Sequence, residues 1–293
     1  MFTQVRVAAC SFKPRKFDVA ANADRLEDLF RRSAAAGAEL AVAPEGALDG
    51  YVVMPIIEGA QPAERMHEAA VSLQGPEIGR FRALACELGM CLAFGLAERS
   101  GGDVYNCAVF IDDTGEIRGT YHKMQLAEGC HDDWWFNRLG KRSRAFQTPF
   151  GKCGVLICND RWNPDIARIP VLDGARYLLI PSYGSRSRSQ DKAVLARARE
   201  NGVPIVEANV GVTLIVSKGE VVACERRVDA LTVGVIDVPA APSAANRDRH
   251  EAAFLRWRAV EMPNRYRQGE ARRKAGTEHP VQHDPHGRLV AAG

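Results

Sequence analysis

The chain has 293 residues, of which 46% are hydrophobic and 26% are charged, and its formal net charge is +3. This composition is typical of a globular protein with a sizeable core, and so small a net charge does not indicate nucleic acid as a partner. The apolar runs are shorter than the stretch of about eighteen residues that spans a bilayer, and the N-terminus lacks the pattern of an export signal. We therefore expect a cytoplasmic protein that binds neither nucleic acid nor membranes.

The eight cysteines are scattered along the chain and do not form a CxxC pair. This distribution differs from the clustered cysteines of small secreted scaffolds and from the paired spacing of structural zinc sites. We expect reduced thiols and no bound metal.

The first hundred residues alternate between strand and helix patterns. An apolar run at 5–10 precedes apolar residues at helical spacing that end at Gly37. A second apolar run at 40–43 is a predicted buried strand whose C-terminal end leads to Glu45. A helix pattern over 76–89 then leads to the strand-like segment MCLAFGLAE.

Hairpins interrupt this alternation in the second part of the chain. Two strands over 105–121 surround a turn at 113–115, and Lys123 follows the far strand. The remaining predicted elements are strands at 153–158 and 176–181, helices at 164–174 and 190–201, a hairpin with its turn at 218–219, and a closing strand LTVGVIDVP.

No linker-like segment divides residues 1–240, so we predict one domain in which two sheets have helices outside them. Residues 241–293 lose the strand patterns and gain Arg and His. We predict that this extension contacts a neighbouring subunit, although its composition fits a solvated tail equally well.

Three polar residues follow the ends of predicted elements, where the backbone can hold a side chain over a pocket: Glu45, Lys123 and Cys158. A thiol must lose its proton to attack a carbonyl or nitrile carbon, and a carboxylate can accept that proton. An ammonium beside them favours the thiolate and stabilises the oxyanion that forms. Together they predict a cysteine-dependent hydrolase.

The blocks around these residues resemble the catalytic blocks of the nitrilase (carbon-nitrogen hydrolase) superfamily, in the order Glu, Lys, Cys. They are PEGALDGY, YHKMQL and GVLICNDRWNPDIAR, and the similarity extends over about residues 4–240. The resemblance implies an α/β fold, an α-β-β-α four-layer sandwich that pairs into a homodimer or larger homo-oligomer, with no metal and no organic cofactor. It implies cleavage of a non-peptide carbon-nitrogen bond in a small linear amide or N-carbamoyl compound through a thioester.

The residues after the cysteine indicate how substrate is bound. The sequence CNDR is similar to that of N-carbamoyl-D-amino acid amidohydrolases, whereas Trp162 is more similar to the carbamoylputrescine-cleaving branch. Arg161 pairs either with a substrate carboxylate or with a structural one, and both readings stay open. The backbone N–H of Asn159 is a candidate oxyanion donor beside Lys123.

Many members of the superfamily carry a second glutamate that orients the lysine, a few residues before the glycine that corresponds to Gly140. Here that spacing falls on Asp133, with Glu128 as the rival acid. Either carboxylate would keep Lys123 charged. Trp134, next to the acid, is a candidate wall of the substrate pocket.

Other functions fit parts of the sequence less well. The segment SYGSRSRSQDK, with Lys192, offers serines but not the glycine-serine core of the amidase-signature enzymes. His279, His283 and His286 offer metal ligands without a matching carboxylate frame. A catalytically idle or an acyl-transferring nitrilase-like protein remains the alternative, because the same thioester serves hydrolysis and transfer.

Overall fold

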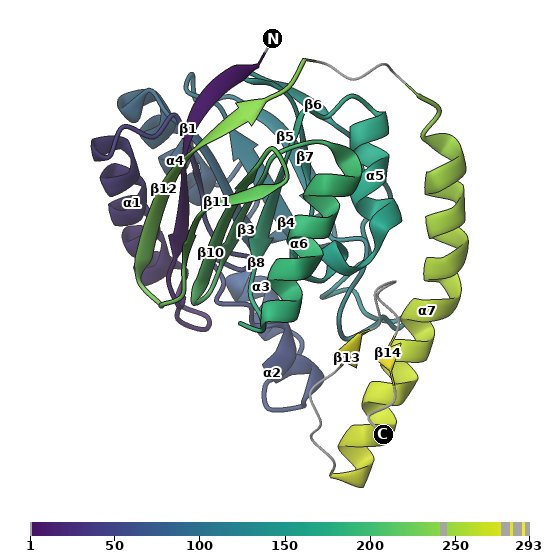
Figure 1. Ribbon diagram of the computed structural model, residues 1–293. Helices are drawn as coiled ribbons and strands as arrows, with labels where there is room; N and C mark the ends of the chain where they lie inside the picture. Colours follow the sequence, from purple (N-terminus) through teal and green to yellow (C-terminus); the bar gives the residue numbers. More distant parts are fainter. Residues whose placement is uncertain (1, 241–244, 277–281, 284–288, 291–293) are drawn as a thin grey trace.

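The computed structural model describes all residues except 1, 241–244, 277–281, 284–288 and 291–293 (Figure 1). The strands are β1 (Thr3–Ser11), β2 (Leu40–Val42), β3 (Cys91–Ser100), β4 (Asp103–Ile111), β5 (Ile117–His122), β6 (Phe146–Thr148), β7 (Gly151–Val155), β8 (Tyr177–Ser182), β9 (Ile205–Asn209), β10 (Val212–Ser217), β11 (Glu220–Glu225), β12 (Ala230–Val238), β13 (Gln282–His283) and β14 (Leu289–Val290). The helices are α1 (Val19–Ala35), α2 (Val53–Ile57), α3 (Arg65–Ala69), α4 (Pro76–Leu88), the 3₁₀ helix η1 (Cys158–Trp162), α5 (Pro164–Leu172), α6 (Arg188–Asn201) and α7 (Asp248–Ala275).

Two six-stranded sheets stack face to face. Their orders are β12-β1-β2-β3-β4-β5 and β11-β10-β9-β8-β7-β6, and both mix parallel and antiparallel neighbours. Helices α1 and α4 cover the outer face of the first sheet, and α5 and α6 cover that of the second (Figure 1). The predicted α-β-β-α four-layer sandwich is confirmed.

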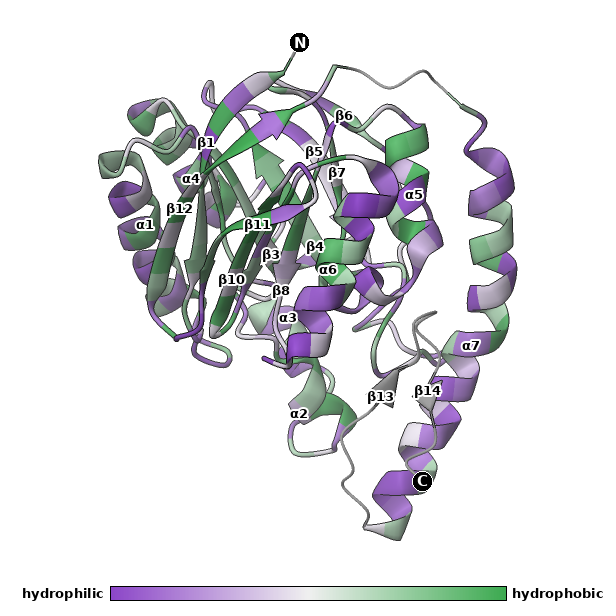
Figure 2. Cartoon of the chain, in the orientation of Figure 1, coloured by the Kyte–Doolittle hydropathy of each residue, from purple (hydrophilic) through white to green (hydrophobic). Residues whose placement is uncertain are grey.

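Apolar strands are buried between the layers, as Figure 2 shows by the hydrophobic colour of the sheets. The parallel strands β1, β2 and β3 carry continuous apolar runs because helices or the second sheet cover both of their faces. The closing strand β12 returns beside β1, with Thr3 opposite Val238. This pairing joins the two ends of the predicted domain of residues 1–240.

Helix α1 illustrates how local sequence builds the outer layer. The Asp18 carboxylate caps its N-terminus by accepting a hydrogen bond from the backbone N–H of Ala21 at 3.1 Å. Leu26 and Phe30 are fully buried one helical turn apart, and the Phe30 ring packs edge-on against Phe81 of α4 with ring centroids 6.0 Å apart.

Gly95 of β3 lets the end of β2 pass close above it. A Cβ atom at this position would lie 2.5 Å from the Cα atom of Glu45, too close for any side chain. The glycine therefore allows the backbone of Glu45 to lie directly against the backbone of β3.

The expected strand over 153–158 is shorter in the structure. Strand β7 ends at Val155, and Cys158 begins η1 with φ at 45°, a left-handed conformation that no strand residue adopts. Leu156 and Ile157 are apolar and buried although they lie outside the strand, so the apolar pattern predicted a strand that was too long.

Helix α7 was not expected in the predicted extension of residues 241–293. Its many charged residues and the internal Pro263 masked the helical pattern, yet the helix packs on α5, with Phe254 fully buried. No described helix is apolar enough over a sufficient length to cross a membrane. His279 and His286 lie outside the described residues, and the side chain of His283 is not described.

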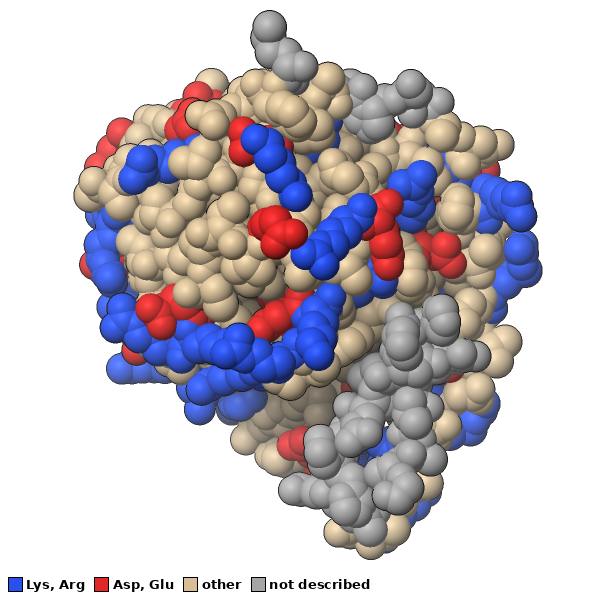
Figure 3. Space-filling view, in the orientation of Figure 1, with Lys and Arg blue, Asp and Glu red and all other residues tan. Residues whose placement is uncertain are grey.

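The surface carries both signs of charge. On the face shown in Figure 3, acidic side chains lie among the basic ones, and uncharged residues cover much of the area between them. This distribution agrees with the small net charge of +3.

Candidate active site

The three residues singled out in the sequence come from separate elements of the two sheets. Glu45 follows β2, Lys123 follows β5, and Cys158 follows β7. The side chains of Glu45 and Lys123 are fully buried, and Cys158 is partly buried.

Glu45 and Lys123 form a buried ion pair. The Lys123 Nζ atom lies 2.7 Å from Glu45 Oε1, and Asn106 Nδ2 donates to the same oxygen at 2.7 Å. The backbone N–H of Tyr183 donates to Oε2 at 2.9 Å. Both carboxylate oxygens are therefore held in place by donors from β4, the residue after β5 and the residue after β8.

The backbone of Tyr183 contacts both the thiol of Cys158 and the Glu45 carboxylate. Its Sγ atom lies 3.8 Å from the carbonyl oxygen of Tyr183, the residue whose N–H holds Glu45. Gly184 leaves the sulfur uncovered, since a Cβ there would lie 3.4 Å from it. The structure thus brings sulfur, carboxylate and ammonium together from positions far apart in the chain.

The charges in this site set which groups are ionised. Burial raises the pKa of the Cys158 thiol to about 11, and the Glu45 carboxylate acts in the same direction, while Lys123 and Arg161 oppose them. Burial disfavours the charged Lys123 ammonium, but the negative charges of the nearby acids, Glu45 first among them, outweigh this effect, so the pKa of Lys123 is raised. The resting site therefore holds a protonated thiol beside a charged ammonium.

Asp160 fixes the turn that carries Cys158. Its Oδ2 atom accepts hydrogen bonds from the N–H of Ile157 at 2.9 Å and from the hydroxyl of Tyr121 at 2.8 Å. Its Oδ1 atom accepts one from the N–H of Gln125 at 3.0 Å. These bonds span both sides of the cysteine and hold its left-handed backbone, a conformation that costs energy unless its surroundings impose it. Burial raises the pKa of Asp160 to about 6.

Arg161 is engaged in a buried network. Its Nε atom donates to the carbonyl oxygen of Cys158 at 2.6 Å and Nη2 donates to Ser182 Oγ at 2.6 Å. Its Nη1 atom donates to Gln190 Oε1 at 3.1 Å and pairs with Glu207. Of the two interpretations left open, these bonds favour the structural one, in which Arg161 holds the backbone of Cys158 instead of a substrate carboxylate.

The neighbours of Arg161 also have structural contacts. The Asn159 amide donates to the carbonyl oxygen of Gln125 at 3.3 Å, and Gln125 Nε2 donates to the carbonyl oxygen of Asn159 at 3.1 Å. Trp162 is half-buried at the end of η1. The Asn159 side chain therefore ties the cysteine turn to the loop after Lys123.

The two acids proposed to support Lys123 lie in different environments. The Asp133 side chain is 90% exposed and lies 3.6 Å from the ring of His131, so its position contradicts the expectation based on spacing. Glu128 accepts a hydrogen bond from Asn137 at 2.6 Å, and its other oxygen is buried without a hydrogen-bond partner among the described residues. Burial raises the pKa of Glu128, while the charge of Lys123 lowers it. Of the two acids, Glu128 is therefore the one with a carboxyl group buried within range of the Lys123 charge.

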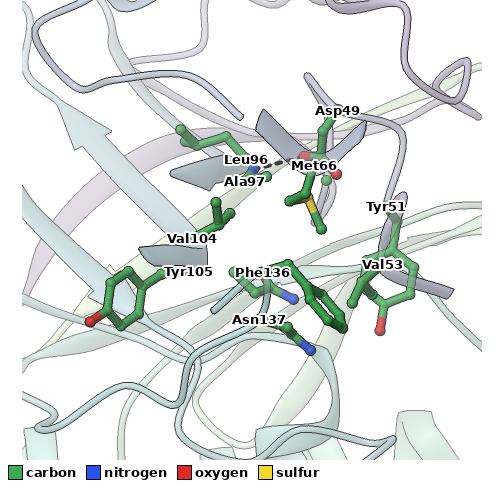
Figure 4. A pocket seen from close by; sticks show the side chains of 12 residues that line it. Asp49, Tyr51, Val53, Met66, Leu96, Ala97, Val104, Tyr105, Phe136 and Asn137 are labelled. Carbon is green, nitrogen blue, oxygen red and sulfur yellow. Dashed lines mark hydrogen bonds between the residues drawn. The ribbon is translucent and has the colours of Figure 1, made fainter. Parts of the chain in front are cut away.

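A small, partly open pocket adjoins this site (Figure 4). Most of its walls are aromatic, aliphatic or amide side chains. It is lined by Gly46, Asp49, Tyr51, Val53, Met66, Leu96, Ala97, Val104, Tyr105, Asn106, Phe136 and Asn137.

Two amides connect the cavity to the acids of the site, because Asn106 bonds Glu45 and Asn137 bonds Glu128. The Lys123 ammonium lies 5.8 Å from the centre of the Tyr51 ring. Phe136 lines the cavity, whereas Trp134 packs behind it, with ring centroids 5.2 Å apart. Trp134 therefore supports a wall and does not form it.

One group of described residues has the donor types of a metal site. Glu98, Cys107 and His122 place their donor atoms within 4.8 Å of one another. The carboxylate and imidazole already contact each other at 2.6 Å, and burial raises the pKa of the Cys107 thiol well above its usual range. We therefore interpret this group as a hydrogen-bonded pair with a buried thiol beside it.

Several residues of the site were not predicted as site residues from the sequence. Tyr183 contributes backbone groups, which carry no sequence signal. Asn106 lies inside the strand pattern of a predicted hairpin, where a polar residue between apolar ones reads as the solvent face. Asp160 stands in the cysteine block, and its burial could have been suspected from the apolar run before it.

Known proteins resemble the chain in sequence and in fold. Residues 6–241 match the family described as Carbon-nitrogen hydrolase. An N-carbamoylputrescine amidase of Solanum tuberosum is 32% identical over 216 residues, which cover 70% of each chain. A bifunctional nitrilase/nitrile hydratase of Lupinus angustifolius is 28% identical over 216 residues, 71% of this chain and 61% of that protein.

Among solved structures, a cysteine-to-serine mutant of the Nesterenkonia AN1 amidase, from the nitrilase superfamily, has a TM-score of 0.68 at 24% identity. The match covers 86% of this chain and 97% of that one, and it supports the fold. Since the family match extends over most of the sequence, the chain belongs to the carbon-nitrogen hydrolase family.

Proposed function

We propose that the protein hydrolyses a non-peptide carbon-nitrogen bond in a small amide or N-carbamoyl compound, with Cys158 as nucleophile. The observation that carries the proposal is the buried Glu45–Lys123 pair at 2.7 Å, which the Tyr183 backbone links to the cysteine sulfur. A carboxylate, an ammonium and a thiol in one site supply a base, an electrostatic stabiliser and a nucleophile.

In the first half of the reaction, the sulfur attacks the carbonyl carbon of the substrate. Because the pKa of Cys158 is raised to about 11, the thiol is protonated before attack and needs a base at that moment. Glu45 accepts this proton and passes it to the departing nitrogen as the carbon-nitrogen bond breaks. The products are an amine or ammonia and a thioester on Cys158.

In the second half, Glu45 takes a proton from water, and the resulting hydroxide attacks the thioester carbon. The carbon-sulfur bond breaks, and the sulfur recovers the proton held by Glu45. One carboxylate thus serves both halves, which its two fixed oxygens permit.

Lys123 stabilises the negative oxygen of each tetrahedral intermediate. Its ammonium keeps its charge at all ordinary pH values, because the neighbouring acids raise its pKa. We assign the second donor to the backbone N–H of Asn159 and the supporting acid to Glu128, whose buried carboxylate interacts with the lysine.

The cavity indicates the charge of the substrate. Among its described lining residues there is no Lys or Arg, and the one carboxylate, Asp49, accepts hydrogen bonds from the backbone N–H groups of Ala97 at 2.8 Å and Val52 at 3.3 Å. Arg161 is occupied by its own network. A substrate carboxylate would be buried without a partner, which is costly.

We therefore propose a neutral amide or an N-carbamoyl amine as substrate, in preference to a carboxylate-bearing N-carbamoyl amino acid or ω-amide. The relatives named N-carbamoylputrescine amidase agree with this choice, because putrescine carries no carboxylate. Assembly into a homo-oligomer and a cytoplasmic location remain predictions.

Replacement of the nucleophile tests the chemistry. We expect Cys158→Ala to reduce turnover by at least about a thousandfold while the melting temperature stays near that of the wild type, because only the reacting atom is removed. Cys158→Ser should retain at most a trace of activity. Ammonia release and thermal unfolding measure both effects, and wild-type rates in either variant would contradict the mechanism.

A matched pair of variants separates the two acids. We expect Glu128→Gln to lower kcat between about tenfold and a hundredfold, since full loss of one oxyanion donor costs about a hundredfold or more. Asp133→Asn should leave kcat within about twofold, because this side chain is exposed to solvent whereas Lys123 is buried. Steady-state kinetics with one amide suffice, and the opposite ranking would restore Asp133 as the supporting acid.

Three amides of similar length test the charge preference: butyramide, 4-aminobutyramide and succinamate. We expect kcat/KM for the anionic succinamate to be lower than for butyramide by about tenfold or more, because the described walls of the cavity include a carboxyl group and no Lys or Arg. Ammonia release at several ionic strengths measures the preference. Faster hydrolysis of succinamate would show that a cation reaches the substrate after all.

A further inference from the structure

We infer that helix α7 positions the loop of residues 124–139 against the active site, with Arg265 as its principal positioning residue. This inference rests on the proposed function, because the loop follows Lys123 and carries Glu128. It gives the C-terminal helix a role within its own subunit, whereas the sequence alone indicated a contact with another one.

One face of α7 turns toward the body of the protein. Phe254, Met262 and Arg265 are its buried residues, and Arg258 on the same face is half-buried. Their spacing of four, four and three residues places them along one stripe of a helix. Phe254 packs into the core, while the other three contact the backbone of the loop that follows Lys123 and of Gly140 at its end.

The two ends of the loop are tied to each other and to the helix. The backbone N–H of Gly140 donates to the carbonyl oxygen of Lys123 at 2.9 Å, and Arg258 Nη1 donates to the carbonyl oxygen of Gly140. A Cβ atom on Gly140 would lie 2.0 Å from the carbonyl oxygen of His122, so the two chain segments are in direct contact. Helix α7 therefore binds the point at which the loop closes.

The part of the loop around Glu128 is also bound to the helix. Arg265 Nη1 donates to the carbonyl oxygen of Leu126 at 3.4 Å, and the backbone N–H of Cys130 donates to the carbonyl oxygen of Met262 at 3.2 Å. These two bonds lie on either side of Glu128, two residues away in each direction.

Gly129 makes this close approach possible. Its φ is 78°, and a Cβ atom there would lie 2.3 Å from the Tyr266 nitrogen and 2.5 Å from the Met262 carbonyl oxygen. The backbone next to Glu128 thus lies against the backbone of the helix, with no room for a side chain between them.

The position of Glu128 depends on this docking. One carboxylate oxygen binds Asn137, which belongs to the same loop, and the other is buried without a hydrogen-bond partner among the described residues. This bond ties the carboxylate to the sheet only through Asn137, whose neighbours Trp135 and Arg138 bond the backbone of Val104 in β4 at 2.7 and 2.9 Å. The bonds from α7 to Leu126 and Cys130 fix the backbone segment that carries Glu128 itself.

Arg265 is built for this role. Its guanidinium is fully buried, pairs with Glu261 at 2.8 Å and lies 5.7 Å from the centre of the Trp257 ring. A buried charge is stable only when it is paired, so the ion pair holds the group in place to reach the loop. On the helix, the Arg265 side chain is therefore a fixed donor instead of a mobile surface group.

The test compares Arg265→Met with Arg267→Met, the same change at an exposed position of α7. We expect Arg265→Met to lower kcat about tenfold with a smaller change in KM, because the loop then no longer fixes the acid beside Lys123. Arg265→Lys should recover part of the loss, and Arg267→Met should behave as wild type.

Coupling to Glu128 distinguishes positioning from general destabilisation. If Arg265 acts through Glu128, Arg265→Met should cause less than about a twofold further loss in a Glu128→Gln background. Two independent losses that multiply would overturn the inference. A wild-type kcat in folded Arg265→Met would do the same.

Hydrogen exchange gives a readout that does not need turnover. The Cys130 amide bonds the helix directly, so its exchange should accelerate at least about tenfold in Arg265→Met and not in Arg267→Met. Unchanged exchange in Arg265→Met would overturn the inference, whatever the activity of the wild type. A wild type that hydrolyses no amide would instead contradict the proposed function and leave the exchange result to decide the inference. Should Arg265→Met fail to fold, Gly129→Ala disturbs the same contact from the loop side and must give the same kinetic and exchange results.

Discussion

The arrangement of the site depends on one buried interaction, the ion pair between Glu45 and Lys123 at 2.7 Å. Breaking such a pair by removing one partner costs about 3–5 kcal/mol, because the remaining charge is left buried. Each charge here has further partners: Asn106 and the Tyr183 N–H for the carboxylate, and the nearby acids for the ammonium. The sheets hold these donors in place, and the turn that carries Cys158 lies beside Tyr183.

The Cys158 turn complements the ion pair in both geometry and charge. A left-handed backbone places the sulfur at the Tyr183 carbonyl oxygen, and buried bonds from Asp160 and Arg161 hold that backbone on both sides. The thiol keeps its proton at rest because burial and the Glu45 carboxylate outweigh Lys123. In the proposed mechanism the thiol therefore loses its proton to the Glu45 carboxylate as it attacks.

The fold and the convergence of Glu45, Lys123 and Cys158 could be predicted from the sequence, because alternating buried runs define the sheets and each of the three residues follows the end of a strand. The environments of the two candidate acids, Glu128 and Asp133, could not be predicted, since the path of the loop after Lys123 depends on contacts with α7, far along the chain. The hydrogen-bond partners of Arg161 could not be predicted for the same reason, because Ser182, Gln190 and Glu207 belong to three elements later in the chain. Helix α7 itself was missed because charge dominates its composition and only a narrow stripe is buried.

The most direct test of this account is to trap the covalent intermediate. Wild-type protein mixed with a butyryl amide and quenched in acid within a turnover should gain the mass of one butyryl group, located by peptide mass spectrometry on Cys158, and the adduct should disappear after longer incubation as water releases it. An adduct on another residue, or hydrolysis with no adduct at any time under conditions that slow deacylation, would contradict the thioester mechanism.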